Sequence, residues 1–355
     1  MTELEALVRL NLSGMVGSAL LRRLREHTDL GRLHRLSRRE LERVPGIGPI
    51  TSRAIVEAGD PGGEIELAAK HGIDLLPCTS PDFPDALRSL YDHPIVLYRK
   101  GTTTDADALA VGVVGSRECT DYGRRQADRF AREFASLRVT VVSGLARGID
   151  TAAHLGALTA PEGRTFAVLG SGLLRPYPPE NARLLERIWS RGAAFSEFPL
   201  RSGPETANFP RRNRVISGLS LGILVVEAAE RSGALITADW ALEQSREVFC
   251  LPGSVESPLS RGCHRLIRQG ARLVEGPADL LEEIPAFAAL VEPALPLSPL
   301  ERAVLRQLSG APRSAEAIAA STRLPAPSVE NALASLVTKG AAHDTGTLTF
   351  TRAAV

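Results

Sequence analysis

Two short turns in the sequence combine glycine with arginine, residue types suited to binding phosphate. The first turn is Gly115-Ser116-Arg117, and the second contains Ser143, Gly144, Arg147 and Gly148. Glycine lets the backbone approach a ligand closely, and a guanidinium can hold two phosphate oxygens with parallel hydrogen bonds. A glycine turn taken singly could equally serve only to connect a strand to a helix. Because two neighbouring turns repeat the design, we interpret both as phosphate-binding.

A third arginine-rich segment follows at residues 208–214. It contains Asn208, Phe209, Arg211, Arg212, Asn213 and Arg214. Arginine can grip phosphate, amide groups can hydrogen-bond to bases, and an aromatic ring is a surface on which a base can stack. A solvated run of charge would not normally be interrupted by Phe209 or by the apolar pair Val215-Ile216. We therefore predict that this segment binds nucleic acid.

Apolar and β-branched runs predict the strands that would position these segments. They lie at residues 110–114, 139–142, 165–169, 194–198, 222–226 and 247–251, with further strands near 73–76 and 95–98. An amphipathic helix is predicted over 122–137, and the alternation of strands with helices indicates an α/β fold with an extended Rossmann-like parallel sheet. Ligands bind such sheets at the carboxyl ends of the strands. One edge of the sheet is therefore expected to carry the loops that begin at Gly115, Ser143, Gly170, Glu197, Glu227 and Gly253.

A helical domain is predicted before this core, over residues 1–62. It contains two glycine hairpins, and the second, at residues 44–48, resembles the helix-hairpin-helix motif of SAM-like domains. In that motif a helix N-terminus faces a DNA phosphate without reading sequence. Packing or dimerisation of helices is an equally good interpretation. A glycine-proline linker at residues 60–63 is expected to lead into the core, which extends over 63–290.

After the core, the sequence predicts a linker at residues 291–297 and a winged-helix domain over 298–355. Three helices and a threonine-rich hairpin are expected in this C-terminal part. The expected recognition helix, at 328–339, carries only Lys339 as a basic residue. A helix that reads duplex DNA usually brings more positive charge. We therefore favour protein contact or weak DNA contact for this domain.

Charge is divided unevenly along the 355 residues, although the formal net charge is only +1. Residues 111–220 contain sixteen arginines and ten acidic residues, whereas residues 221–296 contain six arginines and eleven acidic residues. A basic segment beside an acidic one predicts a surface directed at a polyanion. The chain has thirty-nine arginines and three lysines, a bias typical of genome composition. The position of an arginine therefore matters more than the number of arginines.

Several functional classes are not signalled by the sequence. No apolar run is long enough to span a membrane and no secretory signal is visible, so a cytoplasmic protein is expected; the four widely spaced cysteines fit a reducing compartment. No dinucleotide-binding fingerprint, nucleoside-triphosphate-binding loop, metal-ligand spacing or nucleophile elbow is found. His154 follows a glycine turn and is interpreted as a residue that packs or caps a helix. We expect no catalytic residue, no cofactor and no metal.

Six motifs occur in the order typical of one protein family. They are GSR at 115–117, SGLARGIDTAAH at 143–154, NFPRRNRVISGLS at 208–220, VVEA at 225–228, SGALITADWALEQ at 232–244 and GCHRLIRQGA at 262–271. On these motifs the chain resembles the DNA-processing protein A (DprA/Smf) family over essentially its whole length. The resemblance implies a homodimer with a Rossmann-like core. It also implies that the core binds and protects single-stranded DNA without strong sequence preference, and loads the RecA recombinase on it during natural transformation.

The resemblance also implies roles for individual residues. Arg117 and Arg147 would be phosphate anchors, and Arg147 stands where the family often has lysine. The segment 208–214 would line the same groove, with Phe209 as a stacking partner. The phosphate-binding interpretation of these loops does not depend on the resemblance, which adds that the phosphate belongs to a DNA strand.

Two other functions compete with DNA binding. Nucleotide phosphoribohydrolases share a Rossmann-like core, and Glu243 could stand for their catalytic glutamate. The double glycine of the signature of those enzymes is absent here, since the corresponding turn begins Arg231-Ser-Gly-Ala. A structural adaptor that uses the N-terminal hairpins and the winged helix is the other alternative. Oligonucleotide binding by the core would distinguish an adaptor from a DNA-binding protein.

Overall fold

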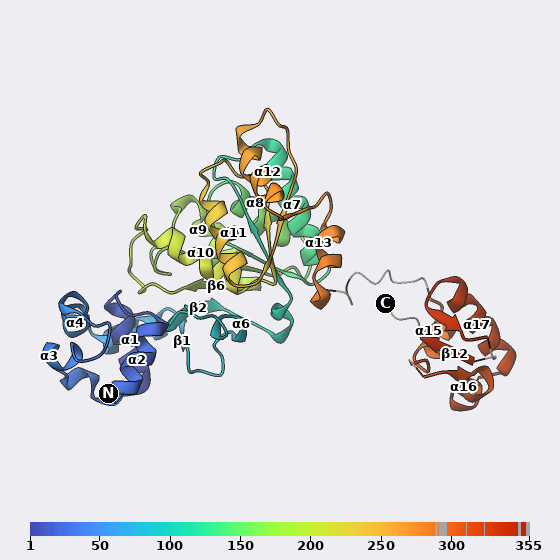
Figure 1. Cartoon of the computed structure of the whole chain (residues 1–355), viewed down its shortest axis with the longest axis horizontal. Coiled ribbons are helices and arrows are strands. Elements are labelled where there is room, and N and C mark those ends of the chain that lie inside the picture. The colour runs from blue at the N-terminus through green and yellow to red at the C-terminus, as the bar shows by residue number, and fades with distance from the viewer. Residues whose placement is uncertain (288–289, 291–296, 310, 323, 347–348, 353–355) are drawn as a thin grey trace. The chain divides into compact units, whose positions relative to one another are not determined.

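The computed structural model describes residues 1–287, 290, 297–309, 311–322, 324–346 and 349–352 (Figure 1). The chain divides into two compact units, Met1–Ala286 and Phe287–Val355, which are described separately below. The predicted linker at 291–297 lies outside the described residues, apart from residue 297. Within the described part of the chain, no helix has the length and apolar character needed to cross a membrane.

A nine-stranded sheet forms the centre of the first unit, in the order β1-β2-β6-β5-β4-β3-β7-β8-β9. The strands are β1 (Asp74–Pro77), β2 (Val96–Gly101), β3 (Ala110–Val114), β4 (Thr140–Ser143), β5 (Thr165–Val168), β6 (Ala193–Ser196), β7 (Gly222–Val225), β8 (Glu247–Cys250) and β9 (Arg272–Leu273). Neighbours from β6 to β9 are parallel, whereas β1 and β2 extend the sheet in antiparallel pairs. The predicted α/β fold with a mainly parallel sheet is confirmed. Only the two-residue strand β9 was not expected.

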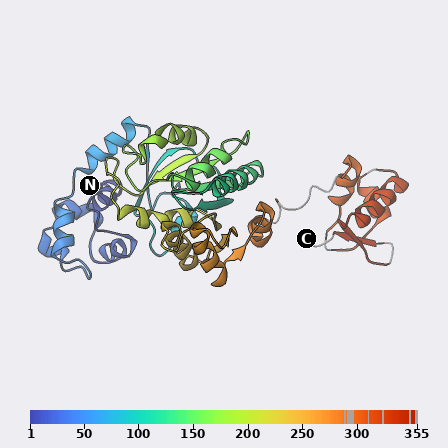
Figure 2. The ribbon, with the colours of Figure 1, turned by 90° about the horizontal axis from the view of Figure 1, so that it is seen from above.

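Two groups of helices cover the sheet. The helices α7 (Asp121–Ser136), α8 (Ile149–Ala157) and α9 (Ala182–Arg191) pack against β2 to β6, and α10 (Asn208–Gly218), α11 (Gly233–Glu243) and α12 (Arg261–Arg268) follow on the way to β9. Strand β3 lies at the point where the order reverses, with β4 on one side and β7 on the other. Because β–α–β crossovers are right-handed, this reversal places the two groups on opposite faces. Figure 2 shows the green and the yellow-to-orange helices on either side of the strands.

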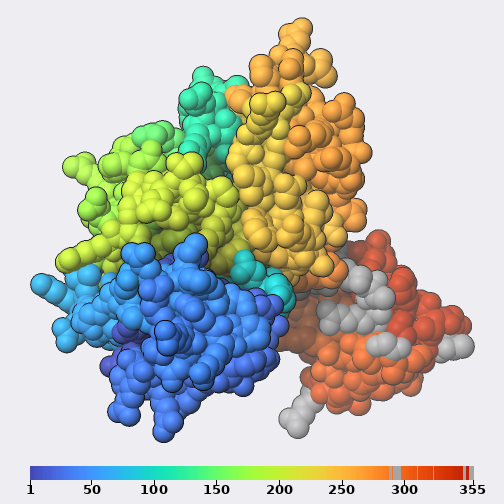
Figure 3. Space-filling model, turned by 60° about the vertical axis from the view of Figure 1, so that its left-hand side comes forward, coloured from blue at the N-terminus to red at the C-terminus, as the bar shows by residue number. Residues whose placement is uncertain are grey.

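Six further α-helices lie before the parallel strands. They are α1 (Glu3–Leu12), α2 (Ser18–His27), α3 (Arg38–Leu41), α4 (Pro49–Val56), α5 (Pro61–Lys70) and α6 (Asp85–Arg88), while α13 (Pro277–Glu283) ends the unit. The buried side chains of α1 and α2 belong to the same continuous core as those of the sheet strands. In Figure 3 the blue N-terminal surface adjoins the yellow-green surface of the α9–α10 region.

The glycine-proline linker predicted at residues 60–63 is wrong. Asp60 is the N-cap of α5, and its carboxylate accepts hydrogen bonds from the N–H groups of Gly62 at 3.0 Å and Gly63 at 2.9 Å. Pro61 fits the first helical position because it has no N–H group to leave unpaired. The expected domain boundary between residues 62 and 63 therefore falls inside a capped helix. That residues 1–62 form a domain of their own stays a prediction.

Within residues 297–352, where the structure describes them, the second unit combines three helices with a small antiparallel sheet, the winged-helix arrangement predicted from the sequence. The helices are α15 (Pro299–Leu305), α16 (Ala315–Thr322) and α17 (Ala326–Thr338), and the strands pair in the order β10 (Arg313–Ser314), β12 (Thr349–Arg352) and β11 (Ala342–Asp344). Lys339 Nζ, just after α17, donates a hydrogen bond to Glu301 Oε1 at 2.6 Å. This bond, together with hydrogen bonds from Ser335 and Ser298, lowers the pKa of Glu301 to about 2. The basic residue of the expected recognition helix is thus already paired within the unit.

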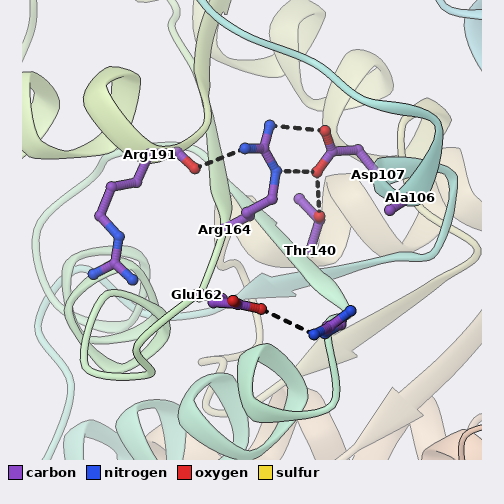
Figure 4. Close-up of a pocket in the computed structure, with 8 residues that line it drawn as sticks. Ala106, Asp107, Thr140, Glu162, Arg164 and Arg191 are labelled. Carbon is purple, nitrogen blue, oxygen red and sulfur yellow. Dashed lines mark hydrogen bonds and ion pairs between the residues drawn. The ribbon is translucent and has the colours of Figure 1, made fainter.

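A cavity of about 340 Å³ lies at the amino ends of β4 and β5 (Figure 4). Arg164 forms two hydrogen bonds with the buried Asp107 carboxylate, from Nε at 2.7 Å and from Nη2 at 2.8 Å. The Thr140 hydroxyl donates to the same carboxylate at 2.6 Å. Arg138 and Glu162, also lining the cavity, form an ion pair at 3.1 Å. Because these charged groups already have partners within the chain, we interpret this cavity as structural.

Asp107→Ala is expected to lower the free energy of unfolding by about 3 kcal/mol, because it leaves the Arg164 guanidinium without its carboxylate partner. Glu57→Ala is the control, since it removes the exposed i,i+4 pair between Arg53 and Glu57 and should cost less than about 1 kcal/mol. Urea unfolding followed by circular dichroism would measure both. Equal losses in the two variants would contradict the structural role of Asp107.

Candidate nucleic-acid interface

A cleft of about 710 Å³ opens at the carboxyl edge of the sheet, where the strand order reverses. Its walls come from segments far apart in the sequence: the loops after β3, β4, β5, β6, β7 and β8, helix α10 and the first half of α11. The predicted convergence of strand-end loops is therefore observed at this edge. The lining includes Gly115, Ser116, Arg117, Asp150, Tyr177, Phe209, Arg212, Asn213 and Arg231.

Two arginines and two aromatic rings form a continuous row at this cleft, which we call the cation–aromatic row. The Arg117 guanidinium carbon lies 5.2 Å from the centre of the Phe209 ring. The Phe209 and Tyr177 rings have centres 5.8 Å apart and are tilted by 55°. The Arg147 guanidinium carbon lies 5.9 Å from the centre of the Tyr177 ring. Cations at such distances are attracted by the ring faces, so the row holds its own members in place.

The two arginines of the row differ in how their charge is used. Arg117 is exposed and forms no ion pair with a carboxylate in the described part of the chain. Arg147 donates a hydrogen bond from Nε to Glu180 Oε1, which raises the pKa of Arg147 and lowers that of Glu180. Arg147 is half exposed, at 52%. Arg117 therefore offers an unshared positive charge, whereas Arg147 would have to share or exchange its carboxylate partner to bind phosphate.

The second glycine turn uses its backbone N–H groups internally, contrary to the sequence-based prediction. The Asp150 carboxylate accepts hydrogen bonds from the N–H groups of Gly144 at 3.1 Å and Ala146 at 3.3 Å. Asp150 is only 6% exposed, and burial raises its pKa. A carboxylate of the chain thus occupies the position at the start of α8 that we had assigned to phosphate. Ser143 is also internal, since its buried hydroxyl donates to Val113 O at 2.6 Å.

Gly148 fixes the two glycine turns against each other. Its φ of 75° is a left-handed conformation that favours glycine, and a Cβ at this position would collide with the backbone oxygens of Ser116 and Arg117. The N–H of Ile149 donates to Ser116 O at 3.2 Å. On the other side, the N–H of Ser116 donates to Glu227 O at 2.7 Å. The loop that carries Arg117 is therefore held between the turns after β4 and β7.

The segment 208–214 is the start of helix α10, and its arginines differ in exposure because every residue of the helix after Arg211 is buried. Arg212 and Arg214 are buried, at 4% and 3% exposure, whereas the Arg211 side chain is 40% exposed. Asn208 and Phe209 are half-buried, and Asn213 is buried with its amide donating to Gly233 O at 3.2 Å. The expectation that all three arginines line the groove as phosphate grips was based on their spacing alone. Two of them instead make contacts inside the protein.

Arg212 connects the ends of two strands. Its Nη1 donates to Gly144 O at 2.7 Å and also to Val168 O, the last residue of β5. Burial lowers its pKa to about 10, although the nearby Asp150 carboxylate opposes the shift. The guanidinium remains protonated at neutral pH, so it neutralises carbonyl dipoles at the carboxyl edge of the sheet. The Phe209 ring lies 6.0 Å from the same guanidinium carbon.

Arg214 belongs to a second internal cluster. Its Nη2 donates to the buried Glu197 carboxylate after β6, and its Nη1 donates to Asp92 O at 2.7 Å. Arg211 approaches the same Glu197 oxygen at 3.3 Å. Burial raises the pKa of Glu197, while the two guanidinium groups act in the opposite direction. Arg117 thus lines the cleft, Arg147 lies next to it against the Tyr177 ring, and Arg214 is buried in the core.

His154 is a packing residue, as the sequence indicated. Its side chain is fully buried, with Nδ1 2.7 Å from the Thr165 hydroxyl oxygen. Glu243, the carboxylate of the competing hydrolase interpretation, is exposed at the C-terminal end of α11. The cleft is lined by the N-terminal half of that helix, as far as Thr237, which lies roughly 9 Å from Glu243 along the axis at about 1.5 Å per residue. Glu243 therefore has no place in the cleft. Among the described residues, no group of three or more His, Cys, Asp or Glu side chains is arranged to hold a metal ion.

Tyr177 was not identified from the sequence. It lies between two prolines after Gly170-Ser171-Gly172 in the loop that follows β5. The sequence does contain a clue to its role, because Tyr177 is an aromatic residue in a strand-end loop and the neighbouring loops are predicted to bind a ligand. Its contact with Phe209 depends on α10 crossing this loop, which the sequence pattern did not show.

Stability should fall in acid because of His154. Burial lowers its pKa from 6.5 to about 3, so below pH 6.5 the unfolded chain takes up a proton that the folded chain does not. His154 therefore contributes stability above pH 6.5 that is lost as the pH falls towards 3, with a slope of about 1.4 kcal/mol per pH unit. His154→Gln should remove about 3 kcal/mol of this pH dependence over two pH units.

Denaturant unfolding of wild type and His154→Gln at a series of pH values would measure the difference. The variant is expected to be less stable at neutral pH, so the informative quantity is the change in the difference with pH. A difference that stays constant from pH 7 to pH 4.5 would contradict the assignment of acid sensitivity to His154.

Family models match both units of the chain. Residues 74–285 match the model described as DNA recombination-mediator protein A, and residues 288–343 match the DprA winged helix domain. Over 211 residues the chain is 48% identical to Protein Smf of Escherichia coli (strain K12); the matched part covers 59% of this chain and 56% of that protein. The match thus spans little more than half the length of this relative.

Two solved structures are similar in fold as well as in sequence. The X-ray structure of DNA processing protein A from Streptococcus pneumoniae is 33% identical with a TM-score of 0.68, and the match covers 80% of this chain and 99% of that one. A structure of DNA processing protein A from Helicobacter pylori, described in terms of a unique single-stranded DNA binding mode, is 28% identical with a TM-score of 0.54. That match covers 60% of this chain and 97% of the other.

Proposed function

The chain belongs to the DNA recombination-mediator protein A family, and from this premise we propose that it binds single-stranded DNA in the cleft at the carboxyl edge of its sheet. The observation that carries the proposal is the cation–aromatic row, Arg117–Phe209–Tyr177–Arg147. Single-stranded nucleic acid is bound without sequence preference where positive charge follows the backbone and aromatic rings receive the bases. The row places both kinds of group side by side.

The proposal gives different roles to the residues predicted from the sequence. Arg117 binds a phosphate directly, and Arg147 binds a second one in exchange for part of its contact with Glu180. Phe209 and Tyr177 offer ring faces to bases, and Asn208, Arg211 and the Gly115-Ser116 backbone contact the strand at the rim. Arg212, Asn213, Arg214, Ser143, Gly144 and Gly148 hold the loops in position from below. Their burial and internal hydrogen bonds support this positioning role.

We further propose that the bound strand is handed to the RecA recombinase in the cytoplasm, during natural transformation and recombination, by a homodimer of this chain. The family resemblance and its motifs support these parts of the proposal. A cleft that binds the sugar-phosphate backbone without reading base edges suits a strand of any sequence. No catalytic step is needed for this role. Titration of the protein with single-stranded and duplex oligonucleotides over a range of salt concentrations tests the central claim of single-strand binding.

Arg117→Ala should weaken binding to unrelated single-stranded sequences by similar factors. Loss of one phosphate contact should also reduce the slope of log affinity against log salt by about 0.7. Arg117→Lys should restore most of the slope, because a lysine still releases a counterion. Arg187→Ala, an exposed residue of α9 that does not line the cleft, is the matched control. Altered preference between sequences with an intact salt slope would contradict phosphate binding by Arg117.

Phe209→Ala should weaken single-strand binding by about 1–3 kcal/mol, the range of one base–aromatic stacking contact. The salt slope should stay unchanged, since no charge is removed. Phe209→Tyr keeps a stacking ring and should bind as wild type does. Thermal melting of each variant would show that the fold persists, because Phe209 also packs against Gly170. A lower salt slope in Phe209→Ala would mean that Phe209 acts only by positioning Arg117.

A further inference from the structure

A second basic groove, of about 470 Å³, lies next to the cleft. Its lining includes Arg231, Arg261, His264, Arg265 and Arg268. Four of these five residues come from helix α12. This helix overlaps the GCHRLIRQGA motif at 262–271, which does not line the cleft. In Figure 3 the orange surface around α12 adjoins the yellow surface of α11, whose first turn borders the cleft. We call this second site the α12 groove.

The arginines of α12 share one exposed face. Arg261, Arg265 and Arg268 follow one another at intervals of four and three residues, the spacing of neighbours on a helix surface. All three are exposed, as is Arg231. In the described part of the chain none of these four arginines forms an ion pair with a carboxylate. Glu230 is the one acidic residue that lines the α12 groove, so the groove is strongly positive.

The opposite face of α12 is fixed to the protein. Cys263 and Leu266 are buried, at 0% and 3% exposure. The N–H of Gly262 donates to Ala228 O at 2.8 Å, and a Cβ at this glycine would collide with the same loop. The loop after β7 therefore supports α12 on one side. Three residues further on, the same loop carries Arg231 into the cleft wall.

Arg231 connects the two sites, because it lines both the cleft and the α12 groove. Arg265 Nη1 donates to Glu230 O, the residue before Arg231, at 3.3 Å. A phosphate backbone leaving the cleft past Arg231 would meet Arg265, which lies between Arg261 and Arg268 on the same face of α12. These arginines span roughly 10 Å along the helix axis, at about 1.5 Å per residue.

We propose that the α12 groove is a phosphate-binding extension of the cleft, which receives the part of a DNA strand that continues beyond the cation–aromatic row. The extension lacks exposed aromatic residues in its lining, which contains only charged groups, His264 and Val255. It therefore binds backbone phosphates through charge and contributes no base stacking. This inference rests on the proposed single-strand binding in the cleft, and it adds that affinity depends on strand length.

The test is a titration of oligothymidylates of increasing length with the full chain and with Arg261→Ala/Arg268→Ala, by fluorescence anisotropy over a salt series. This variant keeps Arg265, which supports the neighbouring loop. The shortest strand that wild type binds should be bound equally well by the variant. Longer strands should gain several-fold in affinity with wild type but not with the variant, and their salt slope should fall by about 1.4 for two lost contacts.

Two control variants sharpen the comparison. Arg183→Ala/Arg187→Ala removes two exposed arginines of α9 that line neither site and should leave all strands unaffected. Arg261→Lys/Arg268→Lys keeps the charges and should restore the gain with length. Circular dichroism and light scattering of each variant would report its fold and its molecular mass.

Four other outcomes would each contradict the proposal, and they differ in which strands are bound or in the molecular mass of the variant. If wild type binds single strands and Arg261→Ala/Arg268→Ala binds long strands equally well, the α12 groove is no extension, while cleft binding stands. An equal loss for short and long strands would place the effect in the cleft itself and also overturn the extension. A changed molecular mass would make the α12 face an interface between copies of the chain. If wild type binds no single strand, the proposed function fails and this inference fails with it.

Discussion

The carboxyl edge of the sheet depends on the buried guanidinium of Arg212. Parallel strands that end side by side present carbonyl oxygens at one edge, and buried carbonyls need hydrogen-bond donors. Arg212 donates to Gly144 O and Val168 O, beyond β4 and at the end of β5, while the Asp150 carboxylate accepts from the turn between β4 and α8. These buried charges make the edge rigid. The ring of Phe209 packs over the same guanidinium, so the surface that we propose for base stacking is built on this buried network.

This arrangement separates binding from support within a single short helix segment. Arg211 points to the half-exposed side, whereas Arg212 and Arg214, one and three residues later, are held by strand-end carbonyls and by Glu197. Buried charge is costly unless it is paired and hydrogen-bonded, and the internal partners meet that condition. In the proposed binding mode the most direct phosphate contact comes from Arg117, whose loop is fixed from both sides by backbone hydrogen bonds. A single free arginine on a rigid loop loses little conformational freedom when it binds.

Much of the fold could be predicted because the strands are short apolar runs with clear turns. Strand β3, with every residue buried, and helix α7, with Phe130 and Phe134 on its buried face, follow directly from periodicity. The site was predicted less well. The residue types at 208–214 predicted nucleic-acid binding, but nothing in their spacing showed that helix α10 enters the core after Arg211, so the burial of Arg212 and Arg214 was not predicted. The role of Asp150 was also not predicted from the sequence. Its carboxylate accepts hydrogen bonds from backbone N–H groups six and four residues earlier in the chain, so it takes the place of an external anion in this turn.

Net charge along the sequence is a poor guide to where this protein is positive. The segment 111–220 appears basic, but several of its arginines form hydrogen bonds with carbonyl oxygens or buried carboxylates inside the protein. Examples are Arg164, Arg191 and Arg212. In the segment that appears acidic, 221–296, Glu247 and Glu283 are paired with Arg272 at the far edge of the sheet. Their charge therefore does not offset the arginines of α12. Electrostatic attraction acts through exposed, unpaired charge over about 10 Å or less in salt, and the exposed, unpaired arginines cross the boundary between the two segments. The path that we propose for a DNA strand, from Arg117 through Arg231 to Arg268, is therefore argued from exposure and pairing rather than from composition.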